Sequence, residues 1–177
     1  MREMSIESIR LSLNSYQRIA ILREKDTDRY LTIWIGPYEA ESISLRLHDV
    51  TPPRPQTHDL LSNVIEQLGA KVQYILLNDL ARDTYYARIV LDVNGDALEI
   101  DSRPSDAISL AVRTGSPIYA EEAVLDQGGE IIRDGDMEDS VEREPDKPVD
   151  PAELERLGPF KDFIEGLDLS GFDDPQK

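Results

Sequence analysis

The sequence predicts an α+β fold in which two similar three-strand-plus-helix units form one pseudo-two-fold domain, followed by a short C-terminal helix. Two observations lead to this prediction. Segments with strand character come in two groups of three, and each group is followed by a segment with helical periodicity. Residues 33–45 also align without a gap with residues 98–110, and both segments are typical of a strand, a turn and a helix.

In the first half, three segments have strand character because they alternate apolar with polar residues or are rich in β-branched and aromatic ones. These segments are SIESIRLSL (5–13), RIAILREK (18–25) and RYLTIWIG (29–36). Apolar residues at three- and four-residue spacings in EAESISLRL (39–47) then predict a helix.

A second helix, HDLLSNVIEQLG (58–69), is predicted to join the first half to the second. The next three strands are KVQYILLNDL (71–80), TYYARIVLDV (84–93) and ALEID (97–101), and the closing helix is SDAISLAVR (105–113). Asn94-Gly95 is a strong hairpin signal between the last two strands. Gly69 and Gly115 are expected to end helices, and Thr57 and Ser105 are expected to cap their starts.

The formal net charge is -17, but this charge is concentrated after the predicted domain. Residues 1–120 hold 13 Lys and Arg against 17 Asp and Glu, whereas residues 121–177 hold 6 against 19. Residues 121–150 are polar, acidic and poor in apolar groups, which predicts a mobile linker. Residues 151–177 contain an amphipathic stripe typical of a short helix that docks on another surface.

Composition excludes several classes of protein. Without cysteine, the chain has neither disulfides nor thiolate metal sites. It has no long apolar run and no basic-then-apolar leader, so we expect a cytoplasmic protein without a membrane partner. The apolar stripe near the C-terminus and the edges of the predicted sheet favour a homo-oligomer.

Two helices begin in nearly the same way, with Arg-Pro followed by a hydroxyl residue and an aspartate. The proline keeps Arg54 and Arg103 extended, in front of the helices that carry Asp59 and Asp106. An arginine facing a carboxylate can clamp a loop or form half of a phosphate site. The sequence leaves both interpretations open.

These motifs also resemble a known family. The IWIG strand followed by Glu39, and then RPQTHDLL, TYYARIVL and DSRPSDAISLAVRTGSPIY, resembles the bifunctional nuclease domain family over about residues 4–120. The resemblance implies a bacterial cytoplasmic nuclease acting on both DNA and RNA. Phosphodiester hydrolysis requires an activated water, charge stabilisation on the phosphoryl oxygens and protonation of the leaving oxygen.

Side chains from three of these motifs, at Glu39, in residues 54–59 and in residues 101–106, could supply each of those functions. Candidate catalytic residues are Glu39, His58, Asp59 and Asp106, because carboxylates and a neutral imidazole at a helix start accept protons. Arg54, Arg103 and Ser105 are candidates for binding the substrate phosphate. The candidate ligands for a divalent metal, Mg or Mn, are Asp59, Asp101 and Asp106.

The alternative is a non-catalytic oligomeric scaffold or an anion-binding regulatory module. The sequence has no dense basic stripe of the kind that marks a nucleic-acid groove. His48 has no motif around it and is assigned to structure, and Arg113 complements the dipole at the end of its helix. A nuclease should gather its carboxylates and His58 in one open cleft, whereas a scaffold should hold them in satisfied ion pairs.

Overall fold

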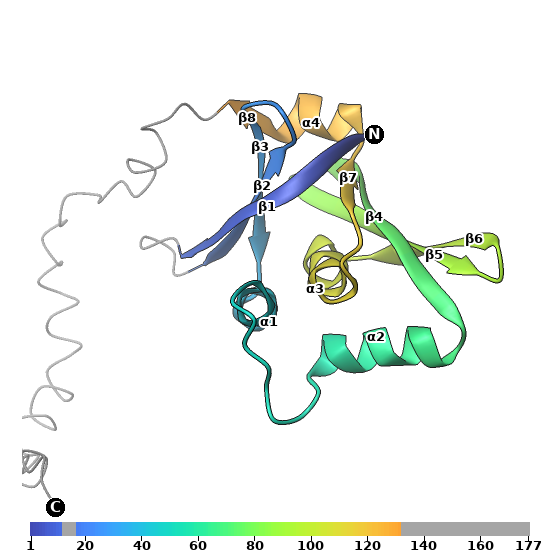
Figure 1. Cartoon of the computed structure of the whole chain (residues 1–177). Helices are drawn as coiled ribbons and strands as arrows, with labels where there is room; N and C mark the ends of the chain where they lie inside the picture. Colours follow the sequence, from blue (N-terminus) through green and yellow to red (C-terminus); the bar gives the residue numbers. More distant parts are fainter. Residues whose placement is uncertain (12–16, 132–177) are drawn as a thin grey trace, which may run out of the picture. The chain divides into compact units, whose positions relative to one another are not determined.

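A computed structural model describes residues 1–11 and 17–131 of the chain. These residues form four helices and one eight-stranded sheet, which confirms the α+β class (Figure 1). In chain order the elements are β1 (Arg2–Leu11), β2 (Arg18–Glu24), β3 (Arg29–Ile35), α1 (Pro37–Leu47), α2 (Thr57–Gln67), β4 (Ala70–Ala81), β5 (Thr84–Val93), β6 (Asp96–Ser102), α3 (Pro104–Thr114), β7 (Ile118–Ala120), α4 (Glu122–Gly128) and β8 (Gly129–Ile131).

The strands follow the order β6-β5-β4-β7-β1-β2-β3-β8 across the sheet. Two antiparallel groups, β1 to β3 and β4 to β6, lie on either side of the short strand β7, which pairs antiparallel with β1 and parallel with β4. Helix α1 follows the first group in the chain and α3 follows the second, and the two helices contact each other. This element order matches the predicted repeat, while a duplication of the sequence stays a prediction.

The turns follow the local sequence. Asn94 and Gly95 both have positive φ, at 57° and 96°, as the tight hairpin between β5 and β6 requires. Arg82 and Asp83 make the β4–β5 turn with φ of 51° and 59°, a conformation that favours glycine, although neither residue is one. The predicted Asn-Gly hairpin is therefore confirmed. The β4–β5 turn contains no glycine, so the sequence held no comparable signal for it.

Helix α3 is the central helix of the fold. Figure 1 shows it between the two groups of strands, and it contacts α1, α2, β4 and β5. Its buried side chains are Pro104, Ser105, Ala107, Ile108, Ser109, Leu110 and Ala111. The helix ends at Gly115 with a φ of 68°, the left-handed conformation that a glycine allows at low cost.

The predicted N-terminal caps of α2 and α3, Thr57 and Ser105, are wrong. Arg103 and Gln56 are the capping residues of α3 and α2, and both have extended backbone. Pro104 has its φ fixed at a helical value and so occupies the first turn, which moves Ser105 inside the helix. At α2 the N-cap is Gln56, so Thr57 is the first helical residue and not the cap.

The first part of the predicted linker is folded. Residues 122–131 form α4 and β8, and Val124 and Leu125 are almost fully buried. Arg29 of β3 holds Glu122 at 2.7 Å, so an ion pair adds to the apolar anchor. Two buried apolar side chains and an ion pair thus anchor this short helix against the sheet. The remainder of the predicted linker and the predicted helix in residues 151–177 lie outside the described residues.

Helix α2 packs less closely than α1 and α3, and none of its residues is buried. Its exposed apolar side chains are Leu60, Leu61 and Val64, and Leu68 follows at its end. In residues 1–11 and 17–131 no helix has the length and apolar character needed to cross a bilayer.

Candidate functional site

Three helix starts meet around one open hollow. Glu39 lies in the first turn of α1, His58 in the first turn of α2 and Asp106 in the first turn of α3, while Arg103 precedes α3. All four side chains line a hollow with a volume of about 500 Å³. The other residues around it are Tyr38, Glu41, Ser42, Pro55, Gln56 and Thr57. Glu39 and Asp106, which are 67 positions apart in the sequence, therefore line the same hollow.

Arg103 binds two carboxylates at the mouth of this hollow. Its Nε and Nη2 donate to Oδ2 and Oδ1 of Asp106 at 2.8 and 3.0 Å, which is a bidentate contact. Nη2 also donates to Oε1 of Glu39 at 2.7 Å. The Arg103 side chain remains 66% exposed despite these contacts. Its guanidinium is thus oriented by protein groups while part of it still faces solvent.

His58 connects Asp106 to Ser42. Its Nε2 lies 3.2 Å from Oδ1 of Asp106, and its Nδ1 lies 3.0 Å from Oγ of Ser42. An ionised carboxylate can only accept, so Nε2 carries the proton. Arg113 donates to Oγ of Ser42 at 3.0 Å, which leaves the Ser42 hydroxyl to donate to Nδ1. This set of bonds is satisfied by a neutral imidazole ring.

The surroundings keep Asp106 and Asp59 ionised. Burial raises the pKa of Asp106, but hydrogen bonds from Arg103 and His58 together outweigh burial and hold the pKa below the usual value. Burial likewise raises the pKa of Asp59, and the Gln56 amide and Arg113 more than offset it. Hydrogen bonds to Asp106 and Glu39 raise the pKa of Arg103 further. Both aspartates are therefore charged at neutral pH.

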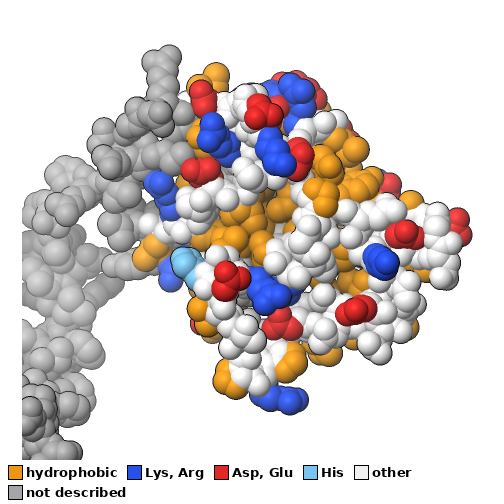
Figure 2. All heavy atoms as spheres, in the orientation of Figure 1, with side chains coloured by type: hydrophobic (Ala, Val, Ile, Leu, Met, Phe, Trp, Pro, Cys, Tyr) orange, Lys and Arg blue, Asp and Glu red, His pale blue; other side chains and the backbone are white. Residues whose placement is uncertain are grey.

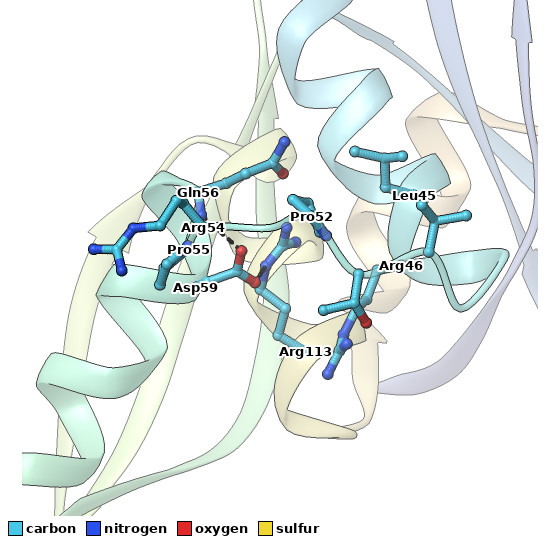
Figure 3. Close-up of a pocket in the computed structure, with 10 residues that line it drawn as sticks. Leu45, Arg46, Pro52, Arg54, Pro55, Gln56, Asp59 and Arg113 are labelled. Carbon is cyan, nitrogen blue, oxygen red and sulfur yellow. Dashed lines mark hydrogen bonds and ion pairs between the residues drawn. The ribbon is translucent and has the colours of Figure 1, made fainter.

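Arg113 of α3 connects this helix to α2 and to α1. Its side chain is only 4% exposed, and its Nε donates to Oδ1 of Asp59 at 2.7 Å. Nη1 donates to the carbonyl of Ser109 at 2.8 Å, and Nη2 contacts both oxygens of Ser42. Figure 3 shows the Arg113 guanidinium directed at Asp59 in a neighbouring hollow of about 220 Å³. The assignment of Arg113 to its own helix dipole missed these contacts.

Ser42 is a second residue that sequence reasoning missed. It lies in the segment that aligns with the second half, at the position that corresponds to Ala107. The sequence signal that could have identified it is a serine at position 42 where the aligned residue of the second half is an alanine. Its side chain is almost fully buried at the lining of the hollow, and its Oγ is already engaged by His58 and Arg113, so it links these two residues and is not a free nucleophile.

The phosphate-binding candidates are separated in space. Arg103 lies at the hollow with His58, whereas Arg54 lines the neighbouring one and extends away from Asp59 and Arg113 (Figure 3). Arg54 is exposed and forms no ion pair within the described residues. Ser105 is buried and lines, together with Arg103, a further hollow between β3 and the β4–β5 turn. Only one of the two Arg-Pro arginines faces the candidate site.

The metal candidates do not form a ligand set. Asp101 is exposed on β6 opposite Arg88, away from the hollow's lining. Asp59 has both oxygens engaged, by Nε of Arg113 and by the amide of Gln56. In residues 1–11 and 17–131 no three His, Asp or Glu side chains are placed to hold a cation together. Asp59 and Asp106 are thus paired with arginine in this arrangement, and the Mg or Mn site stays a prediction.

Gly36 gives Glu39 its position. The Glu39 side chain folds back over the start of α1, and a Cβ at position 36 would overlap its Oε2. Glu39 is otherwise held by the single contact between Oε1 and Arg103. Oε2 of Glu39, which makes no hydrogen bond within the described residues, thus occupies space that a side chain at position 36 would fill.

The charges around the domain are mixed. On the face in Figure 2, basic and acidic side chains lie next to one another, with hydrophobic side chains between them. This agrees with the expectation that the chain carries no dense basic stripe. On this face an anion would therefore be bound by a few oriented groups rather than by a broad positive surface.

Comparison with known proteins gives one family. The bifunctional nuclease domain matches residues 20–133. "Uncharacterized protein Rv1829" of Mycobacterium tuberculosis is 38% identical over 172 residues, which cover 97% of this chain and 98% of that protein. "Bifunctional nuclease 1" of Arabidopsis thaliana is 26% identical over 121 residues, and that of Oryza sativa subsp. japonica is 25% identical over 117. These matches cover 66% and 64% of this chain but only 37% and 35% of the plant proteins.

Proposed function

The chain belongs to the bifunctional nuclease domain family, and from that premise we propose that it hydrolyses phosphodiester bonds of DNA and RNA at the hollow around Arg103. One observation carries the proposal. Glu39, His58, Arg103 and Asp106 come from three separate segments and line a single open hollow. Convergence of a cation, carboxylates and an imidazole in a cleft is what phosphodiester hydrolysis requires.

Arg103 is the group that stabilises negative charge on the phosphoryl oxygens. Its guanidinium is planar, permanently charged and already oriented by Asp106 and Glu39. Because 66% of the side chain is exposed, a phosphate can reach the donors without unfolding the site. Charge that develops on the phosphoryl oxygens then meets a donor that needs no reorganisation.

Glu39 is the best placed proton acceptor. Both oxygens of Asp106 are hydrogen-bonded to Arg103, and Oδ1 also binds His58, whereas Oε2 of Glu39 makes no hydrogen bond within the described residues. In the proposed step the oxygen of a water attacks phosphorus while its proton moves to Glu39. The bond from phosphorus to the leaving oxygen breaks, and that oxygen takes a proton from water in the open hollow.

His58 and Asp106 position this machinery. His58 donates to Asp106 and so helps to keep the carboxylate that holds Arg103 in one orientation. Dependence on Mg or Mn stays a prediction from the sequence, since the described carboxylates are engaged by arginine. No step above is assigned to a metal.

The test is cleavage of end-labelled single- and double-stranded DNA and RNA in Mg, in Mn and in EDTA. We expect Glu39→Gln to lower the rate by about 100-fold or more, the usual contribution of a general base. Arg54→Gln is the matched control, because Arg54 is an Arg-Pro arginine that lies outside the hollow. Equal loss in both variants, or loss in neither, would place the chemistry elsewhere.

A second candidate function is a non-catalytic scaffold or anion-binding regulator. The observation in its favour is that Glu39 and Asp106 are already paired with the same arginine. On this view Arg103→Gln would destabilise the domain, and the purified wild-type protein would cleave none of the four substrates under any of the three conditions.

A further inference from the structure

Arg103 also lines the hollow to which Ser105 belongs, called the second hollow below, whose lining does not include His58. This hollow has a volume of about 320 Å³ and lies between the end of β3, the β4–β5 turn and the start of α3. Its lining includes Trp34, Gly36, Asp83, Thr84 and Arg103. Arg103 is the residue that this hollow shares with the one lined by Glu39 and His58.

The fold places Trp34 there for a definite reason. Along β3, Ile33 and Ile35 point into the core and are 3% and 9% exposed, so Trp34 points to the opposite face. Within residues 1–11 and 17–131 that face is left largely open at this position, and the Trp34 side chain remains 56% exposed. A large aromatic ring is therefore held at the rim of a hollow by a rigid strand.

The two sides of the hollow come from distant parts of the sheet. Strands β3 and β5 are five places apart in the strand order, but α4 contacts both β3 and β4, and Tyr85 of β5 reaches the carbonyl of Gly128 at 3.5 Å. The two groups of strands are thereby brought together at this seam. The tight turn at Arg82 and Asp83 then presents Asp83 and Thr84 opposite Trp34.

We propose that this second hollow binds one unpaired nucleobase of the substrate strand, stacked on Trp34, while Arg103 binds the adjoining phosphate. The proposal rests on the proposed function, since it takes the strand to be the nuclease substrate. Each part of a nucleotide has a counterpart in this hollow: an aromatic face for the base, a guanidinium for the phosphate, and the Asp83 carboxylate and Thr84 hydroxyl for the polar edge of the base. The volume also lies in the range of small-molecule sites.

This geometry selects a single strand. In a duplex both faces of a base are covered by its neighbours, so the base can reach Trp34 only after it is unstacked and unpaired. Stacking on an aromatic ring is tolerant of base identity, because every base has a π-face. The subsite therefore favours unpaired DNA or RNA without reading its sequence.

Trp34 is the only tryptophan in the sequence, so its fluorescence reports on this hollow directly. The full-length Glu39→Gln protein, which should leave its ligand uncut, would be titrated with an eight-nucleotide oligothymidylate. The same titration would use an abasic oligomer with the same phosphates and a blunt duplex. We expect quenching by the oligothymidylate and little quenching by the abasic oligomer or the duplex.

Affinity gives the second measurement. By anisotropy of a labelled oligothymidylate, Trp34→Leu should raise Kd by about tenfold, the effect of losing one stacked base, whereas Trp34→Phe should stay within about threefold. Equal quenching by abasic and base-bearing oligomers, or an unchanged Kd for Trp34→Leu, would overturn the base subsite.

The outcome for the subsite can be separated from the outcome for the nuclease. Quenching specific to the oligothymidylate in a protein that cleaves nothing would keep the base-binding hollow and remove the proposed hydrolysis. Cleavage of the same oligomer by the wild-type protein without any base-specific quenching in the Glu39→Gln protein would keep the hydrolysis and overturn the subsite.

Discussion

Replacing Arg113 with methionine tests whether the buried arginine holds the three helix starts together. The substitution keeps most of the side-chain length but removes the donors to Asp59, to Ser42 and to the carbonyl of Ser109. Breaking a buried ion pair from one side costs about 3–5 kcal/mol, because the remaining charge is uncompensated. The Asp59 side chain is 27% exposed and so partly solvated, which brings the expected loss to about 2–3 kcal/mol.

The assay is urea unfolding of the wild-type and Arg113→Met proteins, followed at neutral and at acid pH. The pKa of Asp59 is lowered in the folded state, so its ion pair stabilises the fold above the unfolded value of about 3.9 and is lost as the pH falls through the folded pKa. We therefore expect the difference in unfolding free energy to be full at pH 7 and to shrink below about pH 4.

Arg54→Met is the matched control, since Arg54 lines the same hollow, is exposed and forms no ion pair within the described residues. Its effect should stay within about 0.5 kcal/mol, as for surface substitutions in general. If Arg113→Met also costs less than about 1 kcal/mol at pH 7, or if its effect does not depend on pH, the reasoning about the buried clamp is refuted.

Three further predictions follow from single residues. Gly36→Ala should displace the Glu39 carboxylate and lower the cleavage rate at least about tenfold. The melting temperature should hardly change, because φ at position 36 is -67°, which alanine adopts readily. A normal cleavage rate would contradict the role given to Glu39. Gly115→Ala should cost about 1 kcal/mol in urea unfolding, since φ there is 68°, and an unchanged stability would show that α3 can end otherwise. Exposed Leu60 of α2 and Leu68, which follows that helix, predict a homo-oligomer by light scattering. The double variant Leu60→Glu, Leu68→Glu should be a monomer, and a monomeric wild-type mass would refute the prediction.

Much of the secondary structure could be predicted because its causes are local. Alternating β-branched residues, the Asn94-Gly95 turn and the stop at Gly115 each act within a few residues, and the structure confirms them. The error at residues 122–131 has a tertiary cause instead. A composition that is too polar to fold alone becomes ordered once a neighbouring sheet offers Val124 and Leu125 a surface to pack on.

The sequence by itself also determined which chemical groups are available: Glu39, His58, Asp106 and two Arg-Pro arginines at helix starts. Only the tertiary structure decided that Arg103 faces His58 while Arg54 faces away, because the same local motif stands in front of both helices. It also decided that Ser42 and Arg113 complete the network, through contacts between residues 71 positions apart in the chain. Partners at such separations depend on how α1 and α3 pack, and no pattern within either helix encodes that packing.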